Sequence, residues 1–147
     1  MRKILNSLEE TKEFGKELAK SLSKDMDRVV LLRGEMGAGK TTLVSQIVRE
    51  LGENTGATSP TFIIINQYCD NIYHVDLWRV NETEIGALGL CEILSGSNIV
   101  FIEWAEKLPA GYLESFNRST VTIQIQNLGE NKRQVTAHGI YDRSGRC

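Results

Sequence analysis

The residues best suited to chemistry lie in the segment GEMGAGKT, Gly34 to Thr41, which matches G-x-x-x-x-G-K-[ST] at every fixed position. Gly34, Gly37 and Gly39 let the backbone turn inward and aim N–H groups at phosphate oxygens. Lys40 can reach the β- and γ-phosphates of a nucleotide, and the Thr41 hydroxyl can bind Mg²⁺. A strand-like run precedes the segment and a helical pattern follows it. The segment therefore predicts a phosphate-binding loop, or P-loop.

Two acids stand at the ends of predicted strands. Asp76 lies in NIYHVDLWR (71–79), and Glu103 lies in NIVFIEWAEKL (98–108). A P-loop that binds Mg²⁺ needs an acid at the end of a neighbouring strand. Asp76 is the shorter and commoner choice, whereas Glu103 ends the more apolar strand. The residues alone leave the metal role evenly divided between them.

A loop with hydroxyl groups forms the third candidate element. In ATSPTF (57–62), Pro60 stiffens the chain, and Ser59 and Thr61 offer hydroxyls just before a strand. In switch-type nucleotide proteins, a loop threonine senses the γ-phosphate and its metal. Serine, threonine and proline are also ordinary turn residues, so a plain proline turn is the stronger interpretation of this segment by itself.

The elements that position these residues alternate between strands and helices. SLEE (7–10) predicts a capping box that opens a helix, with Phe14, Leu18 and Leu22 facing the core. Further elements are predicted as a strand at 29–34, a helix at 41–51, a hairpin of strands at 60–68 and 72–79, a weaker helix at 82–94, a strand at 98–104, and a second hairpin at 119–126 and 133–139. This order predicts a three-layer α/β, P-loop NTPase-like fold with a mixed parallel and antiparallel sheet, as one domain over 1–147.

Composition narrows the class of protein. The chain has 147 residues and a formal charge of −2, which argues against a broad electrostatic grip on nucleic acid. Three scattered cysteines, Cys69, Cys91 and Cys147, fit a reducing compartment. No apolar run approaches the ~20 residues of a membrane span. The N-terminal segment lacks the core of a signal peptide. We therefore expect a cytoplasmic protein without membrane contact.

The base-reading motifs of GTPases are missing from this sequence. Asp76 is followed by LWR rather than by a D-x-x-G pattern, and NKRQ (131–134) lacks the aspartate of N-K-x-D. Adenine is therefore the expected base. A small-metabolite kinase would need an arginine-rich lid over the phosphates, and the sequence offers only Arg79 after Asp76. An ATPase, a small-metabolite kinase and a nucleotide-gated binding module remain as candidate functions.

Four motifs, in this order, resemble one family: GEMGAGKTTL, TSPTF, YHVDLWR and FIEWAEKLP. Together they are similar to the TsaE family (formerly YjeE), bacterial P-loop ATPases of tRNA threonylcarbamoyladenosine synthesis. The resemblance covers nearly the whole chain. It implies ATP and Mg²⁺ as cofactors and the TsaB and TsaD proteins as partners. In that family the TsaB–TsaD pair modifies the adenosine next to the anticodon, ATP turnover resets the complex, and tRNA is met through the partners.

The resemblance also implies roles for individual residues. The phosphates would be held by Gly37, Ala38, Gly39, Lys40, Thr41 and Thr42. Thr41 and Glu103 would bind Mg²⁺, and Asp76, Lys40 and Thr61 would form the catalytic set. Trp78 departs from the family pattern, which has a tyrosine at this place in DLYR.

The residues that contact adenine are the least determined part of the sequence. Thr11, near the start of the first helix, and Arg133, in the last hairpin, are candidates. The simpler interpretation is stronger: Thr11 is an exposed residue of a first helical turn, and Arg133 is a solvated strand charge.

Overall fold

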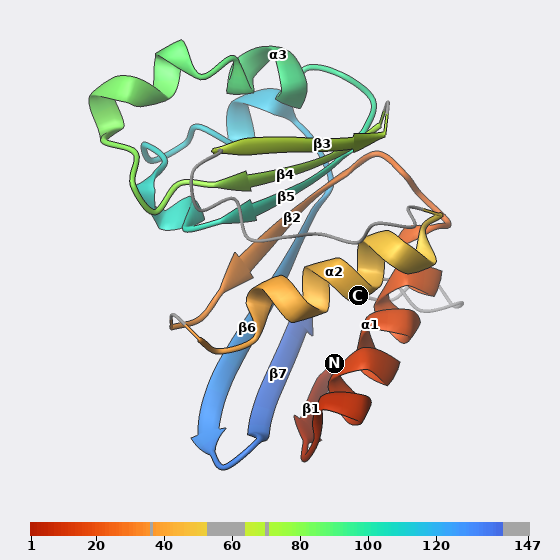
Figure 1. Cartoon of the computed structure of the whole chain (residues 1–147). Coiled ribbons are helices and arrows are strands. Elements are labelled where there is room, and N and C mark those ends of the chain that lie inside the picture. Colours follow the sequence, from red (N-terminus) through yellow and green to blue (C-terminus); the bar gives the residue numbers. More distant parts are fainter. Residues whose placement is uncertain (36, 53–63, 70, 140–147) are drawn as a thin grey trace.

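The computed structural model describes residues 1–35, 37–52, 64–69 and 71–139. Within these residues one seven-stranded sheet has the order β1-β7-β6-β2-β5-β4-β3 (Figure 1). The strands are β1 (Arg2–Leu5), β2 (Arg28–Arg33), β3 (Ile65–Cys69), β4 (Ile72–Asp76), β5 (Ile99–Glu103), β6 (Thr120–Gly129) and β7 (Lys132–His138). The helices are α1 (Leu8–Leu22), α2 (Lys40–Glu50) and α3 (Leu90–Leu94), with 3₁₀ segments η1 (Glu82–Ala87), η2 (Ala105–Lys107) and η3 (Glu114–Phe116).

The centre of the sheet is parallel and its margins are antiparallel. Strand β2 pairs in parallel with β5 on one side and with β6 on the other, and β4 pairs in parallel with β5. Strand β3 is antiparallel to β4, β7 to β6, and β1 to β7. The predicted mixed sheet and both predicted hairpins are therefore confirmed.

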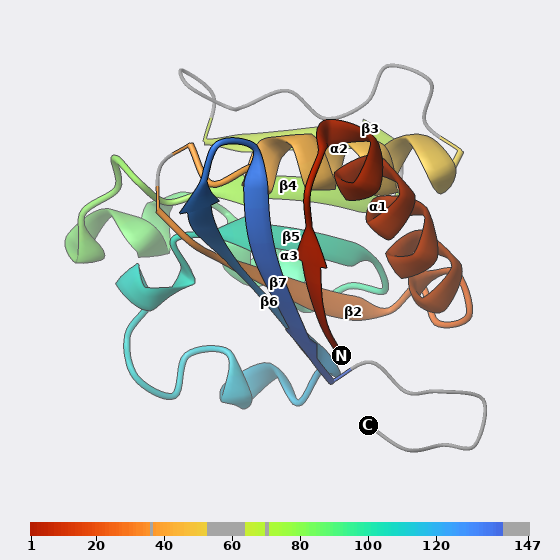
Figure 2. The same cartoon turned by 90° about the horizontal axis from the view of Figure 1, so that it is seen from below.

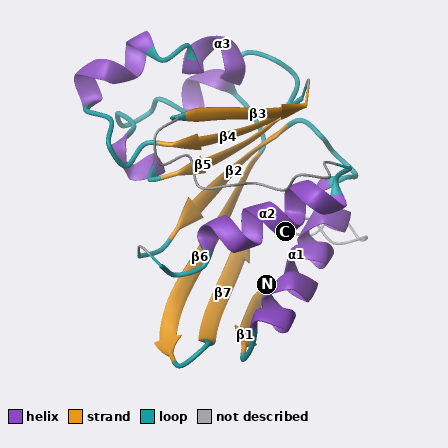
Figure 3. Cartoon of the chain, viewed as in Figure 1, coloured by secondary structure: helices purple, strands orange, loops and turns teal. Residues whose placement is uncertain are grey.

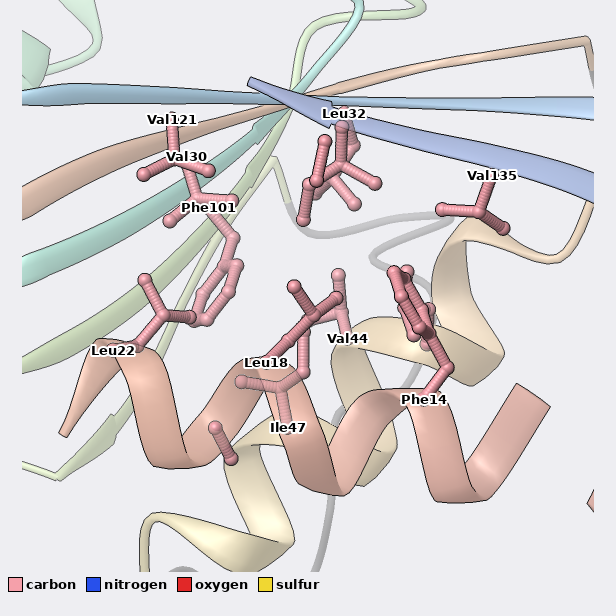
Figure 4. Packing of buried hydrophobic residues seen from close by; sticks show 14 of the residues in the cluster. Phe14, Leu18, Leu22, Val30, Leu32, Val44, Ile47, Phe101, Val121 and Val135 are labelled. Carbon is pink, nitrogen blue, oxygen red and sulfur yellow. The ribbon is translucent and has the colours of Figure 1, made fainter. Parts of the chain in front are cut away.

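Helix α1 forms where its capping residues allow it to begin. The Ser7 side chain accepts a hydrogen bond from the Glu10 amide at 3.1 Å, and the Glu10 carboxylate accepts one from the Asn6 amide at 2.7 Å. Both bonds satisfy N–H groups at the start of the helix. Phe14, Leu18 and Leu22 are almost completely buried, as their spacing predicts. Figure 4 shows these three side chains pointing from α1 toward the sheet.

Each face of the sheet has its own core, which gives three layers. Along β2, Val30 and Leu32 pack with α1 and α2, whereas Val29 and Leu31 pack on the opposite face with η1 and α3. Figure 3 shows the strands running between these two groups of helices. A strand covered on both faces needs an unbroken apolar run, which explains the sequence VVLL.

Two elements differ from the sequence expectation. Strand β1 was not predicted, because only Leu5 of its four residues is buried and the segment has no apolar alternation. It pairs with β7 at the edge of the sheet (Figure 2). The helix predicted over 82–94 is wrong: η1 ends at Ala87, and α3 begins after Gly89, whose φ of 77° is left-handed. Residues 60–63 of the predicted strand lie outside the described part of the chain.

Candidate functional site

The glycine-rich segment 34–41, which the sequence predicts to bind phosphate and which we call the phosphate loop, joins the end of β2 to the start of α2. Its glycines at 34, 37 and 39 have φ angles of 153°, 80° and 106°. Gly34 also lies against β6, and a Cβ there would stand 2.6 Å from the Ile125 carbonyl oxygen. Gly39 is the N-cap of α2, and no described side chain caps that helix end. The first N–H groups of α2 therefore remain available to an anion.

Lys40 is held inside the loop rather than in solvent. Its side chain is only 6% exposed. Its Nζ donates to the Gly34 carbonyl oxygen at 2.8 Å and lies 4.6 Å from the centroid of the Trp104 ring. A phosphate that entered the loop would offer the ammonium a charged acceptor in place of a neutral carbonyl, which makes a stronger hydrogen bond.

The two predicted acids are direct neighbours. Asp76 ends β4, Glu103 ends β5, and the register of the two parallel strands places them opposite each other. Strand β5 also pairs with β2, so both acids lie at the carboxyl ends of the parallel strands, where the phosphate loop begins. The Leu77 amide donates to the Glu103 carbonyl oxygen at 3.1 Å, which continues the pairing past the strand ends.

The environments of the two acids differ. Glu103 is buried, and its Oε2 lies 2.7 Å from Nε2 of His74, a residue with no exposed surface. Asp76 is partly exposed, and its Oδ1 accepts from the Trp78 amide at 3.0 Å. Burial raises the pKa of the Asp76 carboxyl. The Trp78 N–H opposes this shift, the Glu103 charge adds to it, and His74 and Lys40 also oppose it. These groups therefore form one electrostatic cluster.

The residues at this edge fit a magnesium site. Among the described residues, no donor contacts Oε1 of Glu103, and Thr41 stands in the first turn of α2. The described residues contain no group of three or more histidine, cysteine or acidic side chains able to enclose a metal. Mg²⁺ at nucleotide sites takes one or two protein oxygens and completes its shell with phosphate and water, so a hydroxyl and one carboxylate suffice.

A stack of aromatic and cationic groups borders the site. Trp104 directly follows Glu103 and has a left-handed φ of 61°. Its ring lies 4.4 Å from that of Trp78, centroid to centroid. The Nζ of Lys107 lies 5.5 Å from the Trp78 ring and donates to the Trp78 carbonyl oxygen. The order Lys40–Trp104–Trp78–Lys107 therefore connects the loop lysine to the surface.

A pocket of about 510 Å³, part of it open to solvent, adjoins the phosphate loop. Its lining includes Ala38, Gly39 and Thr42 of the loop and helix α2, together with Thr11 of α1 and Arg133 of β7. Arg133 Nε donates to the Ala38 carbonyl oxygen at 2.9 Å. Arg133 is therefore a loop contact rather than a solvated strand charge.

The structure brings together most of the residues that the sequence identified. Loop residues 37–42, Asp76 and Glu103 meet at the carboxyl ends of the parallel strands. Thr61 and Ser59 lie outside the described residues. Sequence reasoning missed His74, and the only signal for it was its position two residues before Asp76, on the same face of a strand. None of the described helices is long and apolar enough to cross a membrane.

Fold and loop together define the class of this protein, an α/β protein with a P-loop NTPase-like fold. The model of the family described as "Threonylcarbamoyl adenosine biosynthesis protein TsaE" matches residues 5–135, and the chain belongs to this family. The family's role lies in the biosynthesis of threonylcarbamoyladenosine in tRNA.

Individual relatives agree with this assignment. The chain is 40% identical over 135 residues to the TsaE protein of Rickettsia felis, covering 88% of this chain and 75% of that one. It is 35% identical over 138 residues to the TsaE protein of Bacillus subtilis, covering 92% and 83% of the two chains. The crystal structure of Bacillus subtilis YdiB superposes with a TM-score of 0.68 at 29% identity, covering 97% of this chain and 87% of that one.

Proposed function

We propose that this protein is a Mg²⁺-dependent ATPase that supports the TsaB–TsaD pair in threonylcarbamoyl modification of the tRNA adenosine next to the anticodon. One observation carries the proposal: a glycine-rich loop, its buried lysine and two strand-end acids meet at the carboxyl ends of the parallel strands. Family membership supports the tRNA pathway.

The chain's own residues divide the work of binding. The N–H groups at the start of α2 and the Lys40 ammonium hold the phosphates, and Lys40 exchanges the Gly34 carbonyl for a phosphate oxygen. Thr41 and Glu103 would hold Mg²⁺. When bound, this ion neutralises charge on the phosphate oxygens.

The environments of the two acids favour different roles. The Glu103 carboxylate is buried and fixed by His74, which suits a metal ligand that must not move. Asp76 is partly exposed and reachable by water, and its raised pKa brings it closer to the range where a carboxylate accepts a proton. We therefore assign the metal to Glu103 and the orientation of the attacking water to Asp76. Thr61 is assigned to the γ-phosphate on the resemblance alone.

The pocket beside the loop is the proposed place of the adenosine. It continues directly from Gly39 and Thr42, so a nucleotide whose phosphates fill the loop extends into it. Thr11 and Arg133 stand on its walls. Their contact with the nucleoside would make α1 and β7 part of one binding site.

The isolated protein is expected to hydrolyse ATP slowly. Phosphoryl transfer needs positive charge on the γ-phosphate, often from an arginine that a partner supplies. Arg133, which contacts the loop, is engaged by the Ala38 carbonyl, and Arg33 precedes the loop on β2 with an exposed side chain. The TsaB–TsaD pair would raise the rate by closing the site. The net charge of −2 is compatible with meeting tRNA through these partners.

The test is single-turnover ATP hydrolysis by the protein alone and with TsaB and TsaD. Slow phosphate release that the pair accelerates would support the proposal. A small-metabolite kinase would transfer the phosphoryl group to an acceptor and not to water. A nucleotide-gated binding module would release no phosphate above background. Fast turnover alone, unaffected by the pair, would contradict the partner-dependent mechanism. Co-purification with TsaB and TsaD, with and without ATP, tests the assembly itself.

A further inference from the structure

We propose that His74 is a positioning residue for Glu103, which holds the carboxylate in one orientation so that its second oxygen faces the divalent cation of a bound nucleotide. This inference rests on the proposed Mg²⁺–nucleotide site and adds a residue to it. His74 itself contacts neither nucleotide nor metal in this proposal.

The first argument is the geometry of the two strands. Ile72, His74 and Asp76 alternate along β4 on the face that α2 covers, while Val75 packs on the opposite face. In register, His74 stands beside Phe101, so its ring must reach along the sheet to the end of β5 to meet Glu103. It does so with Nε2 at 2.7 Å from Oε2. Both side chains are buried, so water does not compete for this bond.

The second argument is the direction of this hydrogen bond. A carboxylate oxygen accepts hydrogen bonds, so the 2.7 Å contact requires an N–H at Nε2 of His74 that points at Glu103. Nδ1 of His74 is buried and has no hydrogen-bond partner among the described residues, so no second contact among them turns the ring away from Glu103. This donor fixes one carboxylate oxygen and leaves the other available to a cation.

The third argument is that stability alone does not explain a histidine at this position. The neighbours of His74 on this face, Ile72 and Phe101, are apolar, and an apolar side chain would fill the space without leaving an orphan nitrogen. Buried polar pairs are often neutral or unfavourable for stability compared with apolar packing. A buried histidine–glutamate pair beside the phosphate loop therefore points to a use in the site.

The chemical consequence concerns the free oxygen. With Oε2 occupied by His74, Glu103 presents Oε1, which no donor among the described residues contacts. Restricting the carboxylate before the cation arrives removes a loss of rotational freedom from the binding step. Outer partners of metal ligands typically change metal affinity by about 10–100-fold when they are removed. The same range is expected here.

The experiment compares His74→Leu, which removes the donor, with His74→Gln, whose amide replaces it at a similar reach. Titrating Mg²⁺ against the protein with a fluorescent ADP analogue gives the Mg²⁺ concentration at half-saturation. We expect this concentration to rise about 10–100-fold in His74→Leu and to recover largely in His74→Gln. Affinity for the analogue in EDTA should stay the same in both. The matched control is His138→Leu, at the chain's other histidine, which is exposed on β7.

The outcomes separate this inference from the function on which it rests. If the wild-type protein requires Mg²⁺ for tight binding and His74→Leu has the same requirement, the positioning role is wrong. If His74→Leu weakens binding equally with and without Mg²⁺, His74 is merely structural and the inference is also overturned. If the wild type binds no adenine nucleotide under any condition, the proposed function itself fails.

A second measurement does not depend on the His74 variants being folded. The chain has two histidines, so ¹⁵N NMR of the metal-free wild-type protein gives two ring spin systems, which His138→Leu assigns. We expect a proton on Nε2 of His74, with this ring N–H protected from exchange. A proton on Nδ1 alone would remove the donor arrangement on which the proposal depends.

Discussion

Strands β2, β5 and β4 end at the phosphate loop, whereas β6 pairs alongside β2 only to Gln124 and continues to Gly129 before β7 returns antiparallel (Figure 1). We call β2, β5 and β4, together with the phosphate loop and the start of α2, the parallel half. The antiparallel half is the β6–β7 hairpin with β1, although β6 itself pairs in parallel with β2. The parallel half brings charged groups together, because the carboxyl ends of its strands lie side by side. The antiparallel half lines one side of the pocket, because its hairpin extends past these strand ends and lies across the pocket from α1.

This difference separates two parts of one binding event. In our proposal the parallel half holds phosphates and metal through Lys40, Glu103 and Asp76, and the antiparallel half holds the nucleoside through the pocket beside Arg133. Variants in the parallel half should therefore affect inorganic polyphosphate and ATP alike. Variants in the antiparallel half should affect ATP more than inorganic polyphosphate.

The largest effect is expected for Lys40→Ala in the parallel half. The change removes the charge that replaces the Gly34 contact when phosphate binds, and should cost about 2–4 kcal/mol in ATP binding or in turnover. Calorimetric titration with ATP and with tripolyphosphate measures it, and both should weaken together. Unchanged ATP affinity together with unchanged hydrolysis would rule out the phosphate site.

The next effect separates the paired acids. Glu103→Gln should raise the Mg²⁺ concentration needed for activity by tenfold or more, on the order of the loss seen when metal sites are perturbed. Asp76→Asn should leave Mg²⁺–ATP binding nearly intact and slow hydrolysis by about 100-fold, the lower range for a general base. Titrating Mg²⁺ against both variants measures the two roles. A metal requirement that shifts in Asp76→Asn and not in Glu103→Gln would mean that the roles are reversed.

A smaller effect is expected in the antiparallel half. Arg133→Ala removes the bond to the Ala38 carbonyl and one side of the pocket, and should weaken ATP by about 1 kcal/mol. Tripolyphosphate affinity should change less. Arg2→Ala is the matched control, since Arg2 is an exposed arginine of the same half that bonds Gln134 instead. Equal losses for ATP and tripolyphosphate would show that Arg133 serves the phosphates, and the proposed division between the halves would be wrong.

The smallest effect is optical. We expect bound Mg²⁺–ATP to draw Lys40 away from the Trp104 ring, so tryptophan fluorescence should change in the wild type and the change should largely vanish in Trp104→Phe. Because the two indoles are in contact, Trp78→Phe should keep a reduced response of the same sign. A response that survives in Trp104→Phe and disappears in Trp78→Phe would place the nucleotide signal at the end of β4 instead.

Much of the parallel half could be predicted from local sequence. Apolar runs identify β2 and β5, the glycine pattern identifies the loop, and each acid is the last residue of its own strand. These features depend on neighbours in the chain, so composition and spacing reveal them. The even division between Asp76 and Glu103 could not be resolved in this way, because the distinguishing partner, His74, is fixed by the register of β4 against β5.

The antiparallel half was harder to predict for a related reason. Its hairpin is local and was found, but β1 buries a single residue and gave no pattern. The contact between Arg133 and the loop spans 95 positions in sequence, and no short-range signal records it. The left-handed backbone conformation of Trp104 could not be predicted from the sequence either, since tryptophan has no preference for that conformation.

Strand β1 has a consequence for the order in which the chain folds during synthesis. It is made before the other described elements, yet its partners are Arg133 to Thr136, and the Met1 amino group donates to the Ala137 carbonyl oxygen. Closing so long a loop is slow and must await the last strand. The phosphate loop and both acids lie between 28 and 103 and can assemble earlier. On the ribosome, the pocket beside α1 is therefore the last part of the site to exist.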